Sequence, residues 1–343
     1  MQEVNLSKNT FTETLYARAA AYFASQQAGK YANFIFYFKA FVLIGLYISA
    51  YTYFVFYTTS FGQLMMLALI LGICHVFIPV NISHDAIHGS LSSRKWINRL
   101  ALHGFELTGS NSYMYSKKHL EAHFNKETGS KTIAIESQAL LMQKSGSEKS
   151  KNLHYVFYIF YALYMIFIRD FLLYFNSKEL IPAVQFIKLI FFKTVYSFAF
   201  VIVPFLYIPL AWWQTAIVLF FMYLIVTIVL VIILLMPTEK MENSRVTDNH
   251  AQNEKWAMEI LKHNVDFSPG SVTLNLIAGG ANLNVVHYLF PDVNHVHYNK
   301  LAAIIELTAK EQSLLYRKQV VKDVFGIHFN YIRNIQSTNS PAE

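Results

Sequence analysis

The sequence predicts an all-α integral membrane protein, with four transmembrane helices in two hairpins and a cytoplasmic helical cap that carries clusters of histidine. Three observations support this fold class. Hydrophobic residues make up 54% of the 343 residues and charged residues only 14%, whereas soluble domains average about 25% charged residues. Four apolar segments reach the roughly 20 residues that a spanning helix needs. Most basic residues lie outside these segments.

The four expected spans cover residues 32–57, 62–82, 189–210 and 213–236. The fourth span contains no charged residue, and the third contains only Lys193, near one end. A fifth apolar stretch, residues 155–175, is interrupted by Arg169 and Asp170. We expect this stretch to form an interfacial helix that lies on the membrane, and a short span is the alternative.

The distribution of basic residues predicts the topology. The short loops at 58–61 and 207–212 contain neither Lys nor Arg, whereas the N-terminal segment (1–30), residues 83–152 and the tail (237–343) hold most of them. The positive-inside rule therefore places both termini and residues 83–152 in the cytoplasm. We expect one domain, 1–343, in which 83–152 and 237–343 form the cytoplasmic cap.

The net charge of +7 fits either nucleic acid or an anionic membrane surface as a partner. The mean hydropathy of +0.32 favours the membrane, and we expect no nucleic-acid partner. The single cysteine, Cys74, excludes a disulfide framework and a cysteine-ligated cluster.

Three histidine clusters lie in the predicted cytoplasmic segments. His84 and His88 follow the second span, and His119 and His123 repeat the same HxxxH spacing. Residues four apart share one face of a helix, so each pair can present two imidazoles to a metal. Neutral imidazole suits iron, zinc and copper. The third cluster begins at His287.

Other features refine this metal-site hypothesis. The neighbouring acids Asp85 and Glu121 either orient the ligands or lie on a solvated helix face. A zinc protease would need Glu after the first His of HExxH, but Asp85 and Leu120 occupy those positions. We treat His295 and His297, beyond the third cluster, as structural residues.

The histidine segments resemble the membrane fatty acid desaturases, in particular the bacterial acyl-lipid and linoleoyl-type branch. The segment HDAIHG at residues 84–89 is similar to the family's HDANHG box, and SYMYSKKH at 112–119 is similar to SYxWKxKH. The segment GGANLNVVHYLFP at 279–291 is similar to GGLNYQIEHHLFP, and HVHY at 295–298 resembles the HxHY that follows it.

The resemblance implies a concrete chemistry. Enzymes of this family hold two irons with nearly all-histidine ligands, and they use oxygen and an external electron donor to remove two hydrogens from an acyl chain. It implies His84, His88, His119, His123 and His287 as metal ligands. It also places Asn282 near the metals through water, although a cap or turn role is equally compatible with the sequence.

The expected partners follow from the same resemblance. The substrate would be an acyl lipid or an acyl thioester in a dry, narrow tunnel. Because no HPGG-like haem motif is present, we expect electrons from a separate donor, of the ferredoxin or cytochrome b5 type. The basic residues Lys117, Lys118 and Lys126 would either dock an acidic donor or contact lipid headgroups.

Three positions depart from the family pattern. The second and third boxes usually end in HH, but here Phe124 follows His123 and Tyr288 follows His287. The family's histidine at the end of the fourth span is matched by Met236. Adjacent helical residues point about 100° apart, so the members of an HH pair would serve different metals. We therefore hypothesise that one metal site is largely deleted and that the other survives.

Two main functions follow from these departures, and other metal-dependent lipid chemistry or a plain structural role in the membrane are the remaining alternatives. The protein is either an iron- and O₂-dependent oxidase of acyl chains, a desaturase or hydroxylase, or a non-catalytic homologue that binds lipid or accompanies an active desaturase.

Overall fold

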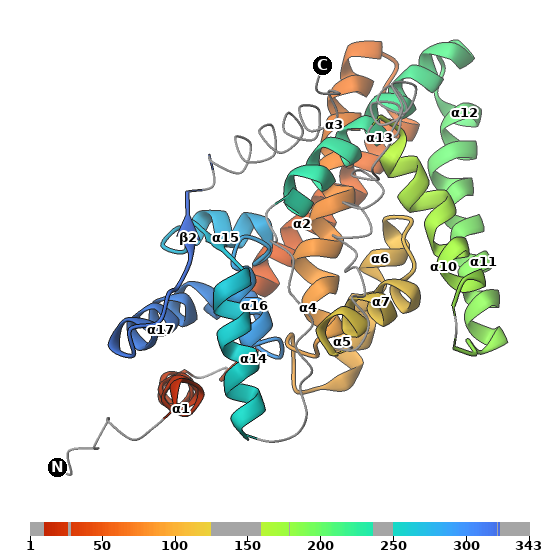
Figure 1. Ribbon diagram of the computed structural model, residues 1–343. Helices are drawn as coiled ribbons and strands as arrows, with labels where there is room; N and C mark the ends of the chain where they lie inside the picture. Colours follow the sequence, from red (N-terminus) through yellow and green to blue (C-terminus); the bar gives the residue numbers. More distant parts are fainter. Residues whose placement is uncertain are drawn as a thin grey trace, which may run out of the picture.

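The computed structural model describes residues 10–26, 29–124, 159–177, 179–235, 250–320 and 322 (Figure 1). These residues are almost entirely helical. Four helices are long and apolar enough to cross a membrane, which confirms the number of spans expected. They are listed here in chain order: Phe34–Phe56, Phe61–Ile87, Ala183–Tyr207 and Trp212–Ile233.

The second span is longer than the sequence predicts, because α3 (Phe61–Ile78) does not stop at Pro79. A π-helical turn, η1 (Pro79–Ser83), continues directly into α4 (His84–Ile87). The third span is likewise built of three pieces, α11 (Ala183–Ser197), the π-turn η3 (Phe198–Ile202) and α12 (Val203–Tyr207). Each π-turn lies at or near a proline, Pro79 or Pro204, which has no backbone N–H to donate. The helix continues through each π-turn, so both spans stay continuous.

The spans form one helical bundle around α3. Both α2 (Phe34–Phe56) and α13 (Trp212–Leu235) pack along α3. Leu64, Ala68 and Leu71 on α3 are fully buried there, whereas many side chains of α2 and α11 face outward as exposed Phe, Ile and Leu. A bundle with an apolar exterior is what a lipid environment requires.

The fifth apolar stretch is described from residue 159 and contains the π-turn η2 (Tyr164–Ile168) and α10 (Arg169–Phe175). It is not among the four candidate spans. Its charges are buried: Asp170 pairs with Lys193 of α11 at 2.7 Å, and Lys193 also donates to the Gly109 carbonyl at 2.6 Å. The interfacial position of this stretch stays a prediction.

A second hydrophobic core lies beside the bundle, at the lower left of Figure 1. Four helices build it: α1 (Phe11–Ala24), α14 (His250–His263), α16 (Asn284–Leu289) and α17 (Tyr298–Glu311). Around it lie α15 (Val272–Ala278), the 3₁₀ turn η4 (His295–His297), and two short parallel strands, β1 (Asp266–Phe267) and β2 (Lys318–Gln319). This small sheet was not part of the all-α prediction.

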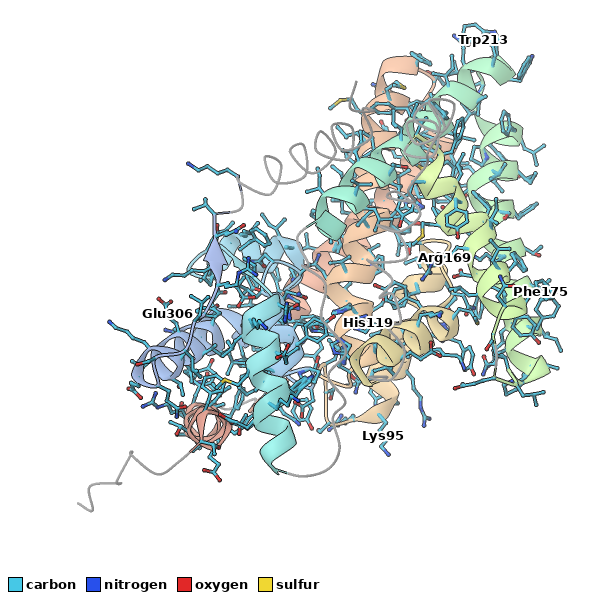
Figure 2. All side chains as sticks on the ribbon, in the orientation of Figure 1. Lys95, His119, Arg169, Phe175, Trp213 and Glu306 are labelled. Carbon is cyan, nitrogen blue, oxygen red and sulfur yellow. The ribbon has the colours of Figure 1, made fainter. Side chains whose placement is uncertain are left out.

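Three further helices lie within the described residues: α5 (Lys95–Leu102), α6 (Gly104–Leu107) and α7 (Ser112–Phe124). In Figure 2, His119 on α7 lies between the bundle and the second core, whose helix α17 is marked by the label of Glu306. Residues from both parts therefore meet around α7.

Candidate metal centre

The first two imidazoles come from the cytoplasm-predicted end of the second span. His84 opens α4 and His88 ends it, so the two lie one helical turn apart and on one side. Gly89 follows with φ of +68°, a conformation that ends the helix at this point. The π-turn before His84 thus couples the position of both imidazoles to a membrane-spanning helix.

The remaining imidazoles come from α7 and α16. His119 and His123 lie one turn apart on α7. His287 lies on α16, which is only six residues long and has no side-chain cap of its own. Asp266 supplies the cap from β1, where its Oδ1 accepts from the backbone N–H of Val285 at 2.7 Å.

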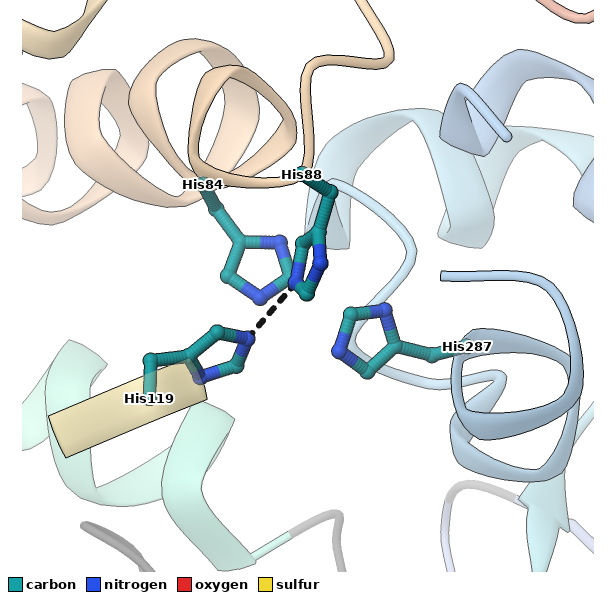
Figure 3. A group of neighbouring side chains, drawn as sticks. All are labelled: His84, His88, His119 and His287. Carbon is teal, nitrogen blue, oxygen red and sulfur yellow. Dashed lines mark hydrogen bonds between the residues drawn. The ribbon is translucent and has the colours of Figure 1, made fainter. Parts of the chain in front are cut away.

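The five imidazoles that the sequence predicted as ligands meet in space. Their Nε2 atoms are 2.8 Å apart between His88 and His119, 3.1 Å between His119 and His123, and 2.9 Å between His123 and His287. Figure 3 shows His84, His88, His119 and His287 facing one another. One ring nitrogen from each of these four lies within 4.8 Å of all the others. We call the five residues the histidine cluster.

Four members of the histidine cluster, His88, His119, His123 and His287, are neutral at physiological pH. Burial lowers the pKa of His88, His119 and His287 well below the usual 6.5, and neighbouring histidines lower it further. Burial also lowers the pKa of His123 to about 3. Neutral imidazoles with converging nitrogens are suited to bind a first-row transition metal.

Asp85 lies beside His84, and its role in orienting the ligands stays a prediction. Its side chain is buried, and Oδ1 lies 3.9 Å from Nδ1 of His84. The other oxygen, Oδ2, accepts from Asn294 Nδ2 at 2.7 Å and lies 2.6 Å from Nδ1 of His295. Asp85 therefore joins α4 to η4.

Sequence reasoning missed what His295 and Lys39 do around Asp85. Lys39 of α2 donates from Nζ to His295 Nε2 at 2.8 Å, and also to Asn81 Oδ1 at 2.8 Å. Because an ammonium only donates, Nε2 accepts and His295 must donate to Asp85 through Nδ1. A single charge inside an otherwise apolar span is a signal of function that the sequence did offer.

Asn282 has a structural role in the contacts described. Its Nδ2 donates to the Phe267 carbonyl at 2.9 Å, and its own carbonyl accepts from the Phe267 N–H at 2.7 Å. Its buried Oδ1 has no protein partner among the described residues. The predicted water-mediated link to a metal stays a prediction.

The three substituted positions are described to different extents. The Tyr288 ring lies 4.8 Å from the His123 ring, centre to centre, so a phenol stands directly beside the cluster. Burial raises the pKa of this phenol to about 12, which keeps it neutral. Phe124 ends α7 but its side chain lies outside what the structure describes, as does Met236 altogether.

Two basic residues predicted to meet a donor or lipid have acidic neighbours. Lys117 and Lys118 each lie 3.6 Å from a carboxylate oxygen of Glu121, and Lys117 also pairs with Glu179. Lys126 lies outside the described residues. Glu121 thus pairs with lysines, which corresponds to the solvated-face alternative.

A mainly apolar cavity of about 60 Å³ lies near the cluster, although none of the five cluster histidines lines it. Tyr115, which is stacked on His119 with ring centres 6.0 Å apart, lines it at one side. The other lining residues include His75 of α3, Val80 of η1, Met165 and Ile166 of η2, and Val226 of α13. The cavity therefore lies among the spans, and Tyr115 stands between it and His119 of the cluster.

Comparison with known proteins agrees with this arrangement. The sequence profile of the fatty acid desaturase family matches residues 60–320. A "sn-1 linoleoyl-lipid 6-desaturase" of Arthrospira platensis is 26% identical over 329 residues, which cover 89% of this chain and 87% of the relative. An "acyl-lipid (8-3)-desaturase" of Physcomitrium patens is 25% identical over 87% of this chain and 66% of its own length. No solved structure matches the chain.

Four helices long and apolar enough to cross a membrane are typical of an integral membrane protein, and the histidine cluster could hold a metal ion. The chain belongs to the fatty acid desaturase family. Members of this family generally depend on two irons.

Proposed function

We propose that this chain is a membrane enzyme that oxidises an acyl chain in lipid metabolism, by desaturation or hydroxylation, at the histidine cluster. One observation carries the proposal: five imidazoles from three distant segments of the chain converge in space. Bound iron would supply the capacity to activate O₂. The two relatives named above are acyl-lipid desaturases by name, which supports an acyl chain as substrate.

The electron balance sets the partners. Desaturation takes two electrons and two protons from the acyl chain, and a separate donor of the ferredoxin or cytochrome b5 type supplies two more electrons. With two further protons, O₂ leaves as two molecules of water. The acyl chain, carried as a lipid or as a thioester, would need an apolar tunnel much larger than the cavity of about 60 Å³ that the structure describes.

The membrane arrangement is part of the proposal. The first two spans and the last two would form two hairpins, with both termini and the histidine-bearing cap in the cytoplasm, all within one domain. The lack of Lys and Arg in the loops at 58–61 and 207–212 supports this orientation. Labelling of single cysteines placed in these loops, compared with cysteines at Lys95, would test it from either side of the membrane.

The substitutions at the ligand positions favour a second candidate, a non-catalytic homologue that binds lipid or accompanies an active desaturase. Expression in a host with a simple fatty acid profile separates the two. An enzyme yields a new double bond or hydroxyl, which is lost in His88→Ala and retained in His103→Ala, whose ring is exposed and outside the cluster. No product from the wild type, together with co-purification of an intact desaturase, would establish the second candidate.

A further inference from the structure

The histidine cluster is arranged around one point. Ring centres are 4.6 to 5.5 Å apart for nine of the ten pairs among its five members. The three Nε2 separations of 2.8, 3.1 and 2.9 Å link His88, His119, His123 and His287 in one unbroken chain of neighbours. The nitrogens within 4.8 Å of one another belong to His84, His88, His119 and His287, and His123 joins this group through its contacts with His119 and His287.

These separations match the coordination sphere of a single ion. A first-row metal lies about 2.0–2.1 Å from an imidazole nitrogen, so two ligands at right angles on one ion are roughly 2.9 Å apart. Opposite ligands on one ion are roughly 4.2 Å apart. The four nitrogens that lie within 4.8 Å of one another fall close to this limit.

Two ions would require a larger arrangement. In two-metal sites the ions are about 3.5–4 Å apart, so ligand atoms on their outer sides are roughly 6–8 Å apart. Five imidazoles would also leave each ion with only two or three protein ligands. At the one substituted position whose side chain is described, the aromatic ring of Tyr288 stands beside His123 where the family has a second imidazole.

We infer that the histidine cluster binds one metal ion per chain, held by His84, His88, His119, His123 and His287, in place of the family's two irons. The donor set present does not fit a two-iron centre. Five imidazoles around one ion leave a sixth octahedral position for an external ligand. Only the choice of iron as the ion rests on the proposed function.

Metal stoichiometry tests this inference directly. The full chain, purified in lipid nanodiscs and stripped of metal, is titrated with Co²⁺ while the visible absorption of the ion is followed. We expect the absorption to saturate at one equivalent, and elemental analysis of protein expressed with iron to give one ion per chain. Saturation at two equivalents, or two tightly bound irons, overturns the inference.

Variants identify the site. His88→Ala and His123→Ala are each expected to weaken Co²⁺ binding at least tenfold, whereas the matched control His103→Ala keeps the wild-type affinity. Thermal melting in the absence of metal checks that each variant is folded. Unchanged Co²⁺ binding in both cluster variants would place the ion elsewhere and overturn the inference.

The fatty acid assay keeps this inference separate from the proposed function. One ion per chain without product leaves the metal site standing and removes the proposed oxidation. Two ions per chain together with product would overturn the one-ion inference and support the proposed oxidation.

Discussion

Lys39→Met tests how the first span contributes to the metal centre. Lys39 donates to His295 Nε2, which makes His295 donate to Asp85, and the free oxygen of Asp85 faces Nδ1 of His84. Methionine keeps the length of the side chain and removes all three hydrogen bonds of the ammonium, the third of which goes to the Leu276 carbonyl. His295 then loses the partner of its Nε2, so only the contact with Asp85 and the surrounding packing hold the ring in place.

The expected magnitude follows from the position of each group. Loss of a partner that orients a metal ligand lowers metal affinity about 10–100-fold. Asp85 lies next to the ligand, and we expect Asp85→Asn to be near the upper end of that range. Lys39 acts through His295 and is therefore two residues further away than Asp85. Lys39→Met should weaken Co²⁺ binding by about tenfold, or about 1.4 kcal/mol.

Competition of the protein with a chelator for Co²⁺ measures this effect. Lys95→Met, which removes an exposed lysine of α5, serves as the control and should leave the affinity unchanged. Melting temperatures without metal separate a loss of folding from a loss of affinity. An affinity within twofold of the wild type in Lys39→Met would refute the proposed chain of orientation.

Three further changes probe how the fold holds the site. Asp170→Asn breaks a fully buried pair with Lys193 and should lower the free energy of unfolding in detergent by about 3–5 kcal/mol. Burial raises the pKa of Asp266 to about 7 in the folded chain, against an ordinary value of 3.8. The folded state therefore holds a proton between pH 4 and 7 that the unfolded state has lost, and the free energy of unfolding should fall across this window by up to roughly 4 kcal/mol as pH rises. Gly279→Ala places a Cβ 2.6 Å from the Val80 carbonyl oxygen at φ of +59°, and should lower stability by about 1–3 kcal/mol together with metal occupancy.

Matched measurements decide each of these outcomes. Glu306→Gln removes an exposed ion pair with Lys318 and should change the free energy of unfolding little. If Asp170→Asn changed it as little as Glu306→Gln does, burial of the Asp170 pair would not be important for stability. The difference in the free energy of unfolding between wild type and Asp266→Asn isolates the pH effect of this carboxyl from that of the histidines. If this difference did not change with pH, the raised pKa of Asp266 would be contradicted. Gly270→Ala, at a glycine with open space around it, is the control for Gly279.

The sequence alone was sufficient to predict the spans and to identify the histidines. About 20 consecutive apolar residues have few folded states available other than a membrane helix, so the four spans were predicted near their observed positions. The HxxxH spacing depends only on the helical period, and both pairs lie on helices as expected. The departures at Phe124, Met236 and Tyr288 were likewise visible in the order of residues.

The tertiary structure decided how these residues meet. The sequence did not show that the second span continues through a π-turn past Pro79 and delivers His84 into the cluster. It also gave no means to join Lys39, Asp85 and His295, because these contacts link residues up to 256 positions apart. Local patterns report on neighbours along the chain, whereas the number of metal ions depends on distances between nitrogens from three separate helices. Only the packing of the bundle against the second core brings those nitrogens to a single point.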